Sequence, residues 1–232
     1  MKFIEHGFTE IYHQYIVLEV DTLTEELKGV KVNENDCFVL CSSFCDTDGR
    51  LQLNVLAVGD DWDHVTKGLK RKGMLGYLNV EDIYECEMKI IEPTEEMIAK
   101  NEPFLQKAEA DCDDDVMMLR NDSRFDSIRQ VDYPDTVLAW FPFGKRIHEV
   151  FICITGTKGP FITAYLDEEL ADLDVQFGER FWALPINHGE DTHLLAMMSG
   201  DNLEGEALEE RDRLMAELEK FGIGFNGISF KS

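Results

Sequence analysis

Three cysteines near residue 40 are the most regular candidate metal ligands in the sequence. Cys37, Cys41 and Cys45 would share a face of a helix, but the residues between them, Phe-Val-Leu and Ser-Ser-Phe, are typical of a strand. Four residues of strand span about 13 Å, whereas a zinc–sulfur bond is about 2.3 Å long. One zinc ion therefore cannot bridge neighbouring members of the set, and we predict buried structural cysteines and no bound metal.

Two clusters of carboxylates are candidate cation sites. One is the run Asp-Cys-Asp-Asp-Asp from Asp111 to Asp115, and the other is Asp46-Thr-Asp48-Gly49. Adjacent acids on one segment point in different directions, and a calcium loop requires alternating ligands with a distal glutamate. We therefore interpret the first cluster as a solvated acidic loop and the second as a turn.

Histidines supply the candidate acid–base chemistry. His188 and His193 flank Glu190 and Asp191 in a polar stretch, and His148 and Glu149 are adjacent in an apolar run. A pocket that gathers His148, Glu149, His188 and His193 would favour a small-molecule-binding or hydrolytic domain. No phosphate-binding loop, dinucleotide turn, nucleophile elbow or zinc-protease motif accompanies these residues, and we expect no cofactor.

Charge restricts the classes of partner. The chain has 232 residues, of which 47 are acidic and 22 are basic, so its formal net charge is −25. Nucleic-acid binding depends on lysine and arginine at phosphates, and anionic lipid attracts basic segments. The composition therefore argues against both and favours a basic protein partner.

The N-terminal sequence and the cysteine content indicate a compartment. The first 15 residues contain no long apolar stretch of a signal peptide, and no apolar run approaches the roughly 18 residues of a membrane span. Without a secretory signal, the six cysteines are expected to be reduced thiols. We therefore expect a cytoplasmic protein with no membrane partner.

Hydrophobic patterning predicts an α+β fold with mainly antiparallel sheets, packed helices and two α/β parts. The first part, residues 1–92, has a strand at 15–20, a hairpin of strands 37–45 and 50–58, and a short helix that Asp60 or Asp61 begins. A further strand is expected in Ile83–Ile91, with Tyr84, Cys86, Met88 and Ile90 on its apolar face.

The second part, residues 93–232, is organised around a central antiparallel sheet. A helix begins near Pro93 and is expected to break or restart at Pro103. Short helices follow, with Val116, Met118, Leu119, Phe125 and Ile128 as apolar anchors. Strands are then predicted within residues 135–186. The strand that contains His148–Thr155 is expected to be apolar on both faces, and Pro185 indicates a sheet edge or strand end.

The C-terminal region combines a predicted helix with concentrated acid. Leu203, Ala207, Leu214, Leu218 and Phe221 recur at helical spacing, and Gly222 is a natural stop. An acidic helical turn is expected at 167–174. We predict that these two elements present one negative surface, with the following residues as a candidate partner-binding site: Glu206, Glu209, Glu210, Asp172 and Asp174.

Residues 125–186 contain a set of spaced positions that form a pattern: Asp126, Arg129, Tyr133, Pro134, Asp135, Glu149, Phe151, Gly159, Gly178, Glu179 and Phe181. In these positions the stretch resembles a group of uncharacterised bacterial α+β domains of the kind found near toxin-immunity genes. The chain departs from the pattern after its second strand, where Leu166-Asp-Glu-Glu169 replaces an asparagine-glutamate-proline sequence. The resemblance implies a small acidic protein and assigns no catalytic residue. Our leading hypothesis is a non-enzymatic, immunity-type binding protein.

Overall fold

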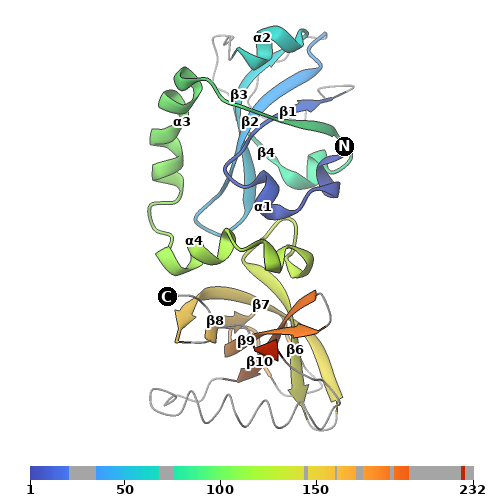
Figure 1. Cartoon of the computed structure of the whole chain (residues 1–232), viewed down its shortest axis with the longest axis vertical. Coiled ribbons are helices and arrows are strands. Elements are labelled where there is room, and N and C mark those ends of the chain that lie inside the picture. The colour runs from blue at the N-terminus through green and yellow to red at the C-terminus, as the bar shows by residue number, and fades with distance from the viewer. Residues whose placement is uncertain are drawn as a thin grey trace. The chain divides into compact units, whose positions relative to one another are not determined.

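The computed structural model describes residues 1–20, 35–67, 76–143, 146–159, 161–170, 175–188, 191–198 and 226–227. The chain forms two units. Unit 1 comprises Met1–Cys112 and Val131–Pro134, and unit 2 comprises Asp113–Gln130 and Asp135–Ser232. Each unit combines a largely antiparallel sheet with helices, which confirms the predicted α+β class (Figure 1).

The sheet of unit 1 has the strand order β4-β3-β2-β1-β5, and all of its pairs are antiparallel. Its strands are β1 (Tyr15–Glu19), β2 (Phe38–Cys45), β3 (Leu51–Gly59), β4 (Tyr77–Asn79) and β5 (Glu87–Ile91). β2 and β3 form the predicted hairpin. Gly49 in the connecting turn has φ of 75°, a conformation that favours glycine.

The strand predicted at Ile83–Ile91 is wrong in its first half. Residues Val80–Ile83 form a 3-10 helix, η2, and the amide of Cys86 donates to the carbonyl of Ile83 in the turn that follows. The strand begins only at Glu87, where it can pair with β1. Met88 is buried, but Ile90 is 37% exposed, so the expected continuous apolar face does not form.

Side-chain caps begin two of the helices in unit 1. The helices are η1 (Phe3–Glu5), α1 (Phe8–Ile11), α2 (Trp62–Thr66), η2 and α3 (Glu95–Ala108). The carboxylate of Asp61 accepts from the amide of His64 in α2, and the hydroxyl of Thr94 accepts from the amide of Met97 in α3. Each bond satisfies an amide that the first helical turn leaves unpaired.

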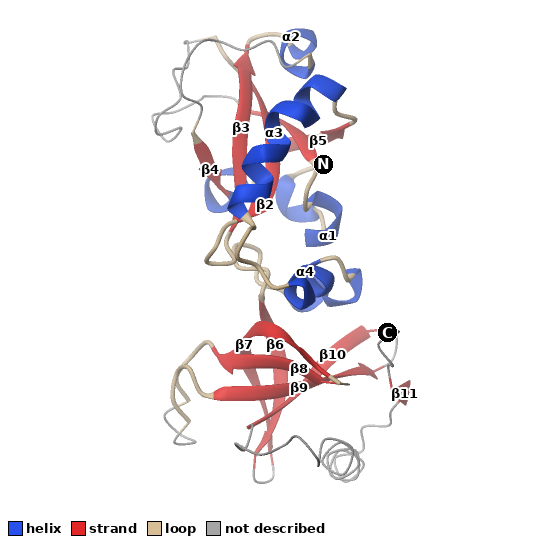
Figure 2. Cartoon of the chain, turned by 90° about the vertical axis from the view of Figure 1, so that its left-hand side faces the viewer, coloured by secondary structure: helices blue, strands red, loops and turns tan. Residues whose placement is uncertain are grey.

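The predicted break at Pro103 is wrong, because α3 continues through it to Ala108. Pro103 is exposed, so the carbonyl that loses its amide partner at this point can be hydrated. The buried face of α3 carries Met97 and Asn101 and packs against β2 (Figure 2). Packing of that face therefore outweighs the local cost of the proline.

Asn101 makes a buried polar contact between α3 and the sheet. Its side-chain oxygen accepts from the amide of Asn54 at 2.9 Å, and its own amide donates to the hydroxyl of Tyr15 at 3.4 Å. Tyr15 and Asn54 flank Ser42 in the strand register. This polar row crosses a face that is otherwise apolar, with Leu40, Ala57 and Met97 in the same core.

The sheet of unit 2 closes on itself. Its strands are β6 (Thr136–Phe143), β7 (Arg146–Lys158), β8 (Phe161–Leu166), β9 (Arg180–His188), β10 (Asp191–Met198) and β11 (Asn226–Gly227). β6 to β10 pair in succession as antiparallel neighbours, and β10 then pairs with β6 in parallel through Leu195 and Trp140. β11 adds to β9.

Alternate residues of these strands fill the inside of the closed sheet. Val137, Ile152, Ile162, Ala183 and Leu194 are completely buried in one core, as expected for a small closed sheet whose interior is packed with side chains. α4 (Asp114–Arg120) and η3 (Ser123–Ile128) add Leu119, Phe125 and Ile128 to it. A second apolar cluster lies on the alternate face and includes Phe161, Leu184 and Leu195.

Three predictions for unit 2 are confirmed in part. β7 carries apolar residues on both faces from Val150 to Ile154, but only one face is buried, and Phe151 and Cys153 on the other are partly exposed. Pro185 lies inside β9 and not at its end, but pairing with β8 ends at Ala183 and pairing with β11 begins at Ile186, so the proline lies at a local sheet edge. Of the predicted apolar anchors, only Met118 is exposed, at 50%.

The predicted acidic turn and C-terminal helix lie largely outside the described residues. Of the turn, residues 167–170 contain no helix, and Leu170 forms a bridge with Val175. The predicted helix near Leu203–Phe221 falls entirely outside the described part of the chain. Among the described helices, none is long and apolar enough to cross a membrane.

Candidate functional site

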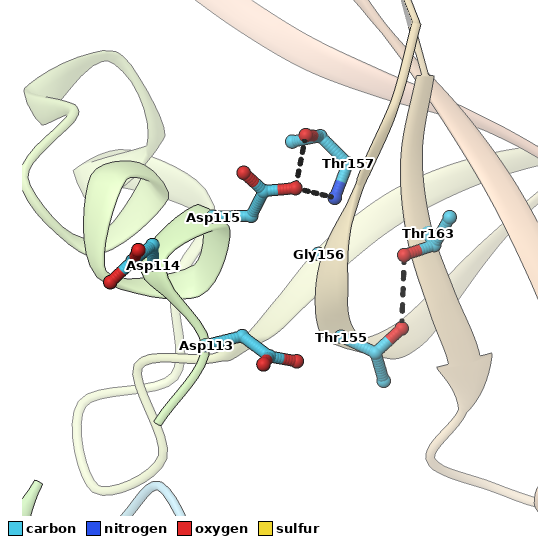
Figure 3. Close-up of a pocket in the computed structure, with 7 residues that line it drawn as sticks. All are labelled: Asp113, Asp114, Asp115, Thr155, Gly156, Thr157 and Thr163. Atoms are coloured by element: carbon cyan, nitrogen blue, oxygen red, sulfur yellow. Dashed lines mark hydrogen bonds between the residues drawn. The ribbon is translucent and has the colours of Figure 1, made fainter. Parts of the chain in front are cut away.

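A pocket in unit 2 gathers the acidic run of the sequence. It lies between the start of α4 and the strands β7 and β8 and has a volume of about 430 Å³ (Figure 3). Three consecutive carboxylates line one side, and three hydroxyls line the other. The lining residues are Asp113, Asp114, Asp115, Thr155, Gly156, Thr157 and Thr163.

The carboxylates are presented by the first turn of α4. Asp113 is the N-cap residue, with φ of −65° and ψ of 140°, and Asp114 and Asp115 follow in the helix. Negative charge is favourable at this end of a helix, because the unpaired amides give it a partial positive charge. The acidic run therefore begins a helix, and the sequence interpretation as a solvated loop is wrong for Asp114 and Asp115.

A buried ion pair fixes α4 on unit 2. The Arg120 guanidinium donates from Nε to Oδ1 of Asp135 at 2.9 Å and from Nη2 to Oδ2 at 2.6 Å. The two side chains are 3% and 11% exposed. Asp135 directly precedes β6, and its carbonyl accepts from the amide of Ile154 in β7. The pair thus connects the helix that carries the carboxylates with the strands that carry the threonines.

An irregularity in β7 shapes the opposite wall. The register with β8 shifts between Ile154 and Gly156, and Gly156 has φ of 147°. Here the carboxylate of Asp115 accepts from the Thr157 amide at 3.2 Å and from the Thr157 hydroxyl at 2.6 Å. The hydroxyls of Thr155 and Thr163 hydrogen-bond each other at 3.1 Å (Figure 3).

The lining can accept hydrogen bonds from a cationic group. The Asp115 carboxylate accepts from Thr157, and the side chains of all three aspartates are exposed. None of the described lining residues is basic. Carboxylates and hydroxyls in this arrangement match the donors of an ammonium or guanidinium group. Within the described residues, no group of three or more His, Cys, Asp and Glu side chains is arranged to hold a metal ion.

The residues predicted for the partner-binding surface cannot be placed. Glu206, Glu209 and Glu210 lie outside the described residues, and so do Asp172 and Asp174. Their grouping into one negative surface therefore stays a prediction.

Two of the four residues of the alternative polar site, Glu149 and His193, lie beside Trp140, and His148 lies on the opposite face of the closed sheet. His148 pairs with Phe141, whose side chain lies in the core, and Glu149 pairs with Trp140 on the other face. The His193 ring stacks on Trp140 at a centroid distance of 4.0 Å. The side chain of His188 is outside the described part of the structure. The pocket of unit 2 contains none of the four.

The cysteines and the turn aspartates have structural roles. All six cysteines lie in the described residues and none forms a disulfide bond, and Cys41 and Cys45 are buried in β2. Burial raises the pKa of the Cys41 thiol, which disfavours the reactive thiolate. Asp46 accepts from the amides of Asp48 and Arg50, so its carboxylate closes the hairpin turn as predicted.

Two of the contacts that the sequence did not predict join oppositely charged or ionisable side chains. One is the Arg120–Asp135 pair, and the other joins His13 to Glu109 at 2.7 Å. For Arg120 a signal existed, because it follows Val116 by one helical turn and so lies on the apolar face of α4. For His13 and Glu109, 96 positions apart, no local pattern links the residues.

Comparison with known proteins gives no relative for this chain. No protein-family model matches it, and no match was found among curated proteins or solved structures.

Proposed function

We propose that this chain is a non-enzymatic cytoplasmic binding protein that recognises a basic protein partner through its acidic surface. The observation that carries the proposal is the formal net charge of −25. Such a charge accelerates encounter with a basic partner at low ionic strength and disfavours nucleic acid and anionic lipid. The resemblance of residues 125–186 to uncharacterised acidic domains of the kind found near toxin-immunity genes is consistent with the same class of function.

Pairing of the basic side chains leaves the excess of acid unchanged, because each pair removes one charge of each sign. Several lysines and arginines of the described residues are bound to carboxylates, and their own charge is thereby compensated. These pairs are Lys2 with Glu85, Arg50 with Glu81, Lys100 with Glu96, Arg120 with Asp135, and Arg124 with Asp122. The remaining acids outnumber the remaining bases, so the field outside the molecule is negative.

Two places on the chain are candidates for the surface that contacts the basic partner. The predicted surface of Glu206, Glu209 and Glu210 with Asp172 and Asp174 is one, and the rim of the pocket at Asp113 and Asp114 is the other. Asp113 and Asp114 are exposed, and exposed charges contribute little to stability, so substitutions at the pocket test binding without unfolding the protein.

Affinity capture from native lysate, followed by isolation of the captured partner and direct binding measurements, tests the proposal. We expect association to slow markedly as the Debye length falls from about 10 Å at 0.1 M salt to about 3 Å at 1 M. The variant Glu206→Lys, Glu209→Lys, Glu210→Lys tests the first place, and Asp113→Asn, Asp114→Asn tests the second.

A matched control distinguishes the effect of the pocket on binding from the effect of the net charge of the protein. Glu95 and Glu96 also lie in the first turn of a helix and are exposed, so Glu95→Gln, Glu96→Gln removes the same charge as the pocket variant at a different place. Equal weakening by the pocket variant and this control would mean that only total charge matters there. A partner that binds with no salt dependence, or that is itself acidic, would refute the proposed function.

A further inference from the structure

One carboxylate joins three segments of unit 1. Glu109 is the residue that ends α3, and its side chain is only 9% exposed. Oε1 accepts from the Tyr12 hydroxyl at 3.0 Å and from the Cys45 amide at 3.3 Å, while Oε2 lies 2.7 Å from Nε2 of His13. Tyr12 and His13 follow α1, and Cys45 ends β2, so Glu109 holds both segments at the end of α3.

His13 is held in an unfavourable backbone conformation at this contact. Its φ is 59°, in the left-handed region that non-glycine residues rarely adopt. The imidazole stacks on Tyr12 at a centroid distance of 3.9 Å, and Tyr12 stacks on Phe8 at 4.9 Å. Such a conformation persists only where surrounding contacts enforce it. Here the contacts are ring stacking, the Glu109 carboxylate and the hydrogen bonds of the flanking Ile11 and Gln14 to Ser43.

We propose that Glu109 is an acid-sensitive latch, whose ionised carboxylate holds residues 8–14 in place and whose protonation releases them. Hydrogen bonds to an ionised acceptor are roughly twice as strong as neutral ones, so protonation weakens all three contacts together. The groups that face the carboxylate are Tyr12 and His13 from the segment after α1 and the Cys45 amide from β2. With that hold weakened, the strain at His13 favours release of the segment.

The direction of the pH dependence follows from the environment. Burial raises the pKa of Glu109, but hydrogen bonds from His13, Tyr12 and the Cys45 amide outweigh it, so the pKa lies below its usual range. A carboxyl group with a lowered pKa in the folded state stabilises the fold above its ordinary pKa, and the contribution is lost as pH falls through the lowered value. The latch is therefore closed at neutral pH and opens only in acid.

Hydrogen exchange on the full chain, corrected for the intrinsic pH dependence of exchange, tests the latch. Glu109→Gln removes the charge. Glu102→Gln is a matched control, because Glu102 lies in α3 and, within the described part of the chain, its side chain accepts a hydrogen bond only from the exposed Gln106. At neutral pH we expect Glu109→Gln to lose roughly tenfold or more of the protection in residues 8–14. The control should keep wild-type protection, as should β3 in both variants.

The acid titration supplies the second measurement. Wild type should lose protection in residues 8–14 at a higher pH than in β3, and Glu109→Gln should show no such step. Wild-type protection of residues 8–14 in Glu109→Gln at neutral pH would overturn the proposal. If Glu109→Gln does not fold, the wild-type titration decides alone, and simultaneous loss in residues 8–14 and β3 would refute the latch.

Discussion

Removing one partner of the Arg120–Asp135 pair should destabilise unit 2 strongly. Asp135→Asn takes away the negative charge that both Nε and Nη2 of Arg120 contact, at 2.9 and 2.6 Å. The guanidinium side chain is only 3% exposed, so water cannot replace the carboxylate. Breaking a buried pair in this way costs about 3–5 kcal/mol, because it leaves a buried charge uncompensated.

The cost can be measured by urea unfolding followed by tryptophan fluorescence. Trp140 and Trp182 belong to unit 2 and Trp62 belongs to unit 1, so a Trp62→Phe background makes the signal specific for unit 2. With a urea dependence of about 2 kcal/mol per molar, the midpoint should fall by about 1.5–2.5 M. A change equivalent to less than about 1 kcal/mol would refute the reasoning, because that is the value of an exposed pair.

A double variant distinguishes the loss of the ion pair from the cost of leaving one charge buried and uncompensated. Arg120→Met with Asp135→Leu replaces both groups by apolar side chains, and such replacements are often neutral or stabilising. We expect the double variant to recover most of the stability that Asp135→Asn loses. A double variant no more stable than Asp135→Asn would show that the cost comes from altered packing or from the loss of aspartate at the residue before β6, and not from the uncompensated charge.

Three further changes test other parts of the structure. Asn101→Leu leaves the Asn54 amide and the Tyr15 hydroxyl without their shared partner, and it should lower the unfolding free energy of unit 1 by about 1–3 kcal/mol in urea titrations followed by circular dichroism. Gly156→Ala should destabilise unit 2 by about 1–3 kcal/mol in the fluorescence assay, because φ is 147° there, and the nearest side-chain atom, 3.5 Å away, leaves room for the methyl group. Burial raises the pKa of Asp122, but hydrogen bonds from Arg124 outweigh it and lower the pKa overall, so wild type should lose this contribution as pH falls through that lowered pKa. The unfolding free energies of Asp122→Asn and wild type should therefore differ at neutral pH and converge in acid, and a constant difference would count against the contact.

Local patterns predicted most strands because each strand carries its own signal. The hairpin of β2 and β3 has two apolar runs around a turn with Gly49, and the strands of unit 2 are separate apolar runs with polar connections. Thr94 and Asp61 likewise begin helices by a rule that depends on near neighbours. Such features are fixed within a few residues and can be derived from the sequence.

How the two prolines are accommodated depends on partners that are distant in the sequence. Pro185 is tolerated inside β9 because pairing with β8 ends at Ala183 and pairing with β11 begins at Ile186, so no ladder bond to those strands is lost at this position. Pro103 is tolerated because α3 buries its opposite face on the sheet. Neither arrangement has a signal near the proline, and sheet closure through β10 and β6 has none either.

The pocket was only partly predictable for the same reason. The acidic run at Asp113–Asp115 is visible in the sequence, but its position opposite Thr157 depends on a helix and a strand separated by 42 residues. The position of Arg120 on the apolar face of α4 indicates that it is buried, but the sequence gives no sign that its partner is Asp135. The acidic character of the pocket was therefore predicted from the sequence. The threonines on its opposite side and the ion pair that holds α4 in place are evident only from the structure.

Unit 1 is completed by residues that follow a part of unit 2 in the sequence. Val131–Pro134 return to unit 1, where the Asp132 carbonyl accepts from the Leu51 amide at 2.8 Å and the Asp132 carboxylate accepts from the Tyr84 hydroxyl. During synthesis, the first 112 residues can emerge from the ribosome without these contacts. Domains generally fold as units in order of emergence. Here the final packing of unit 1 must wait until Pro134 has emerged, after α4 and η3 of unit 2, so the two units share a step in folding although each has its own core.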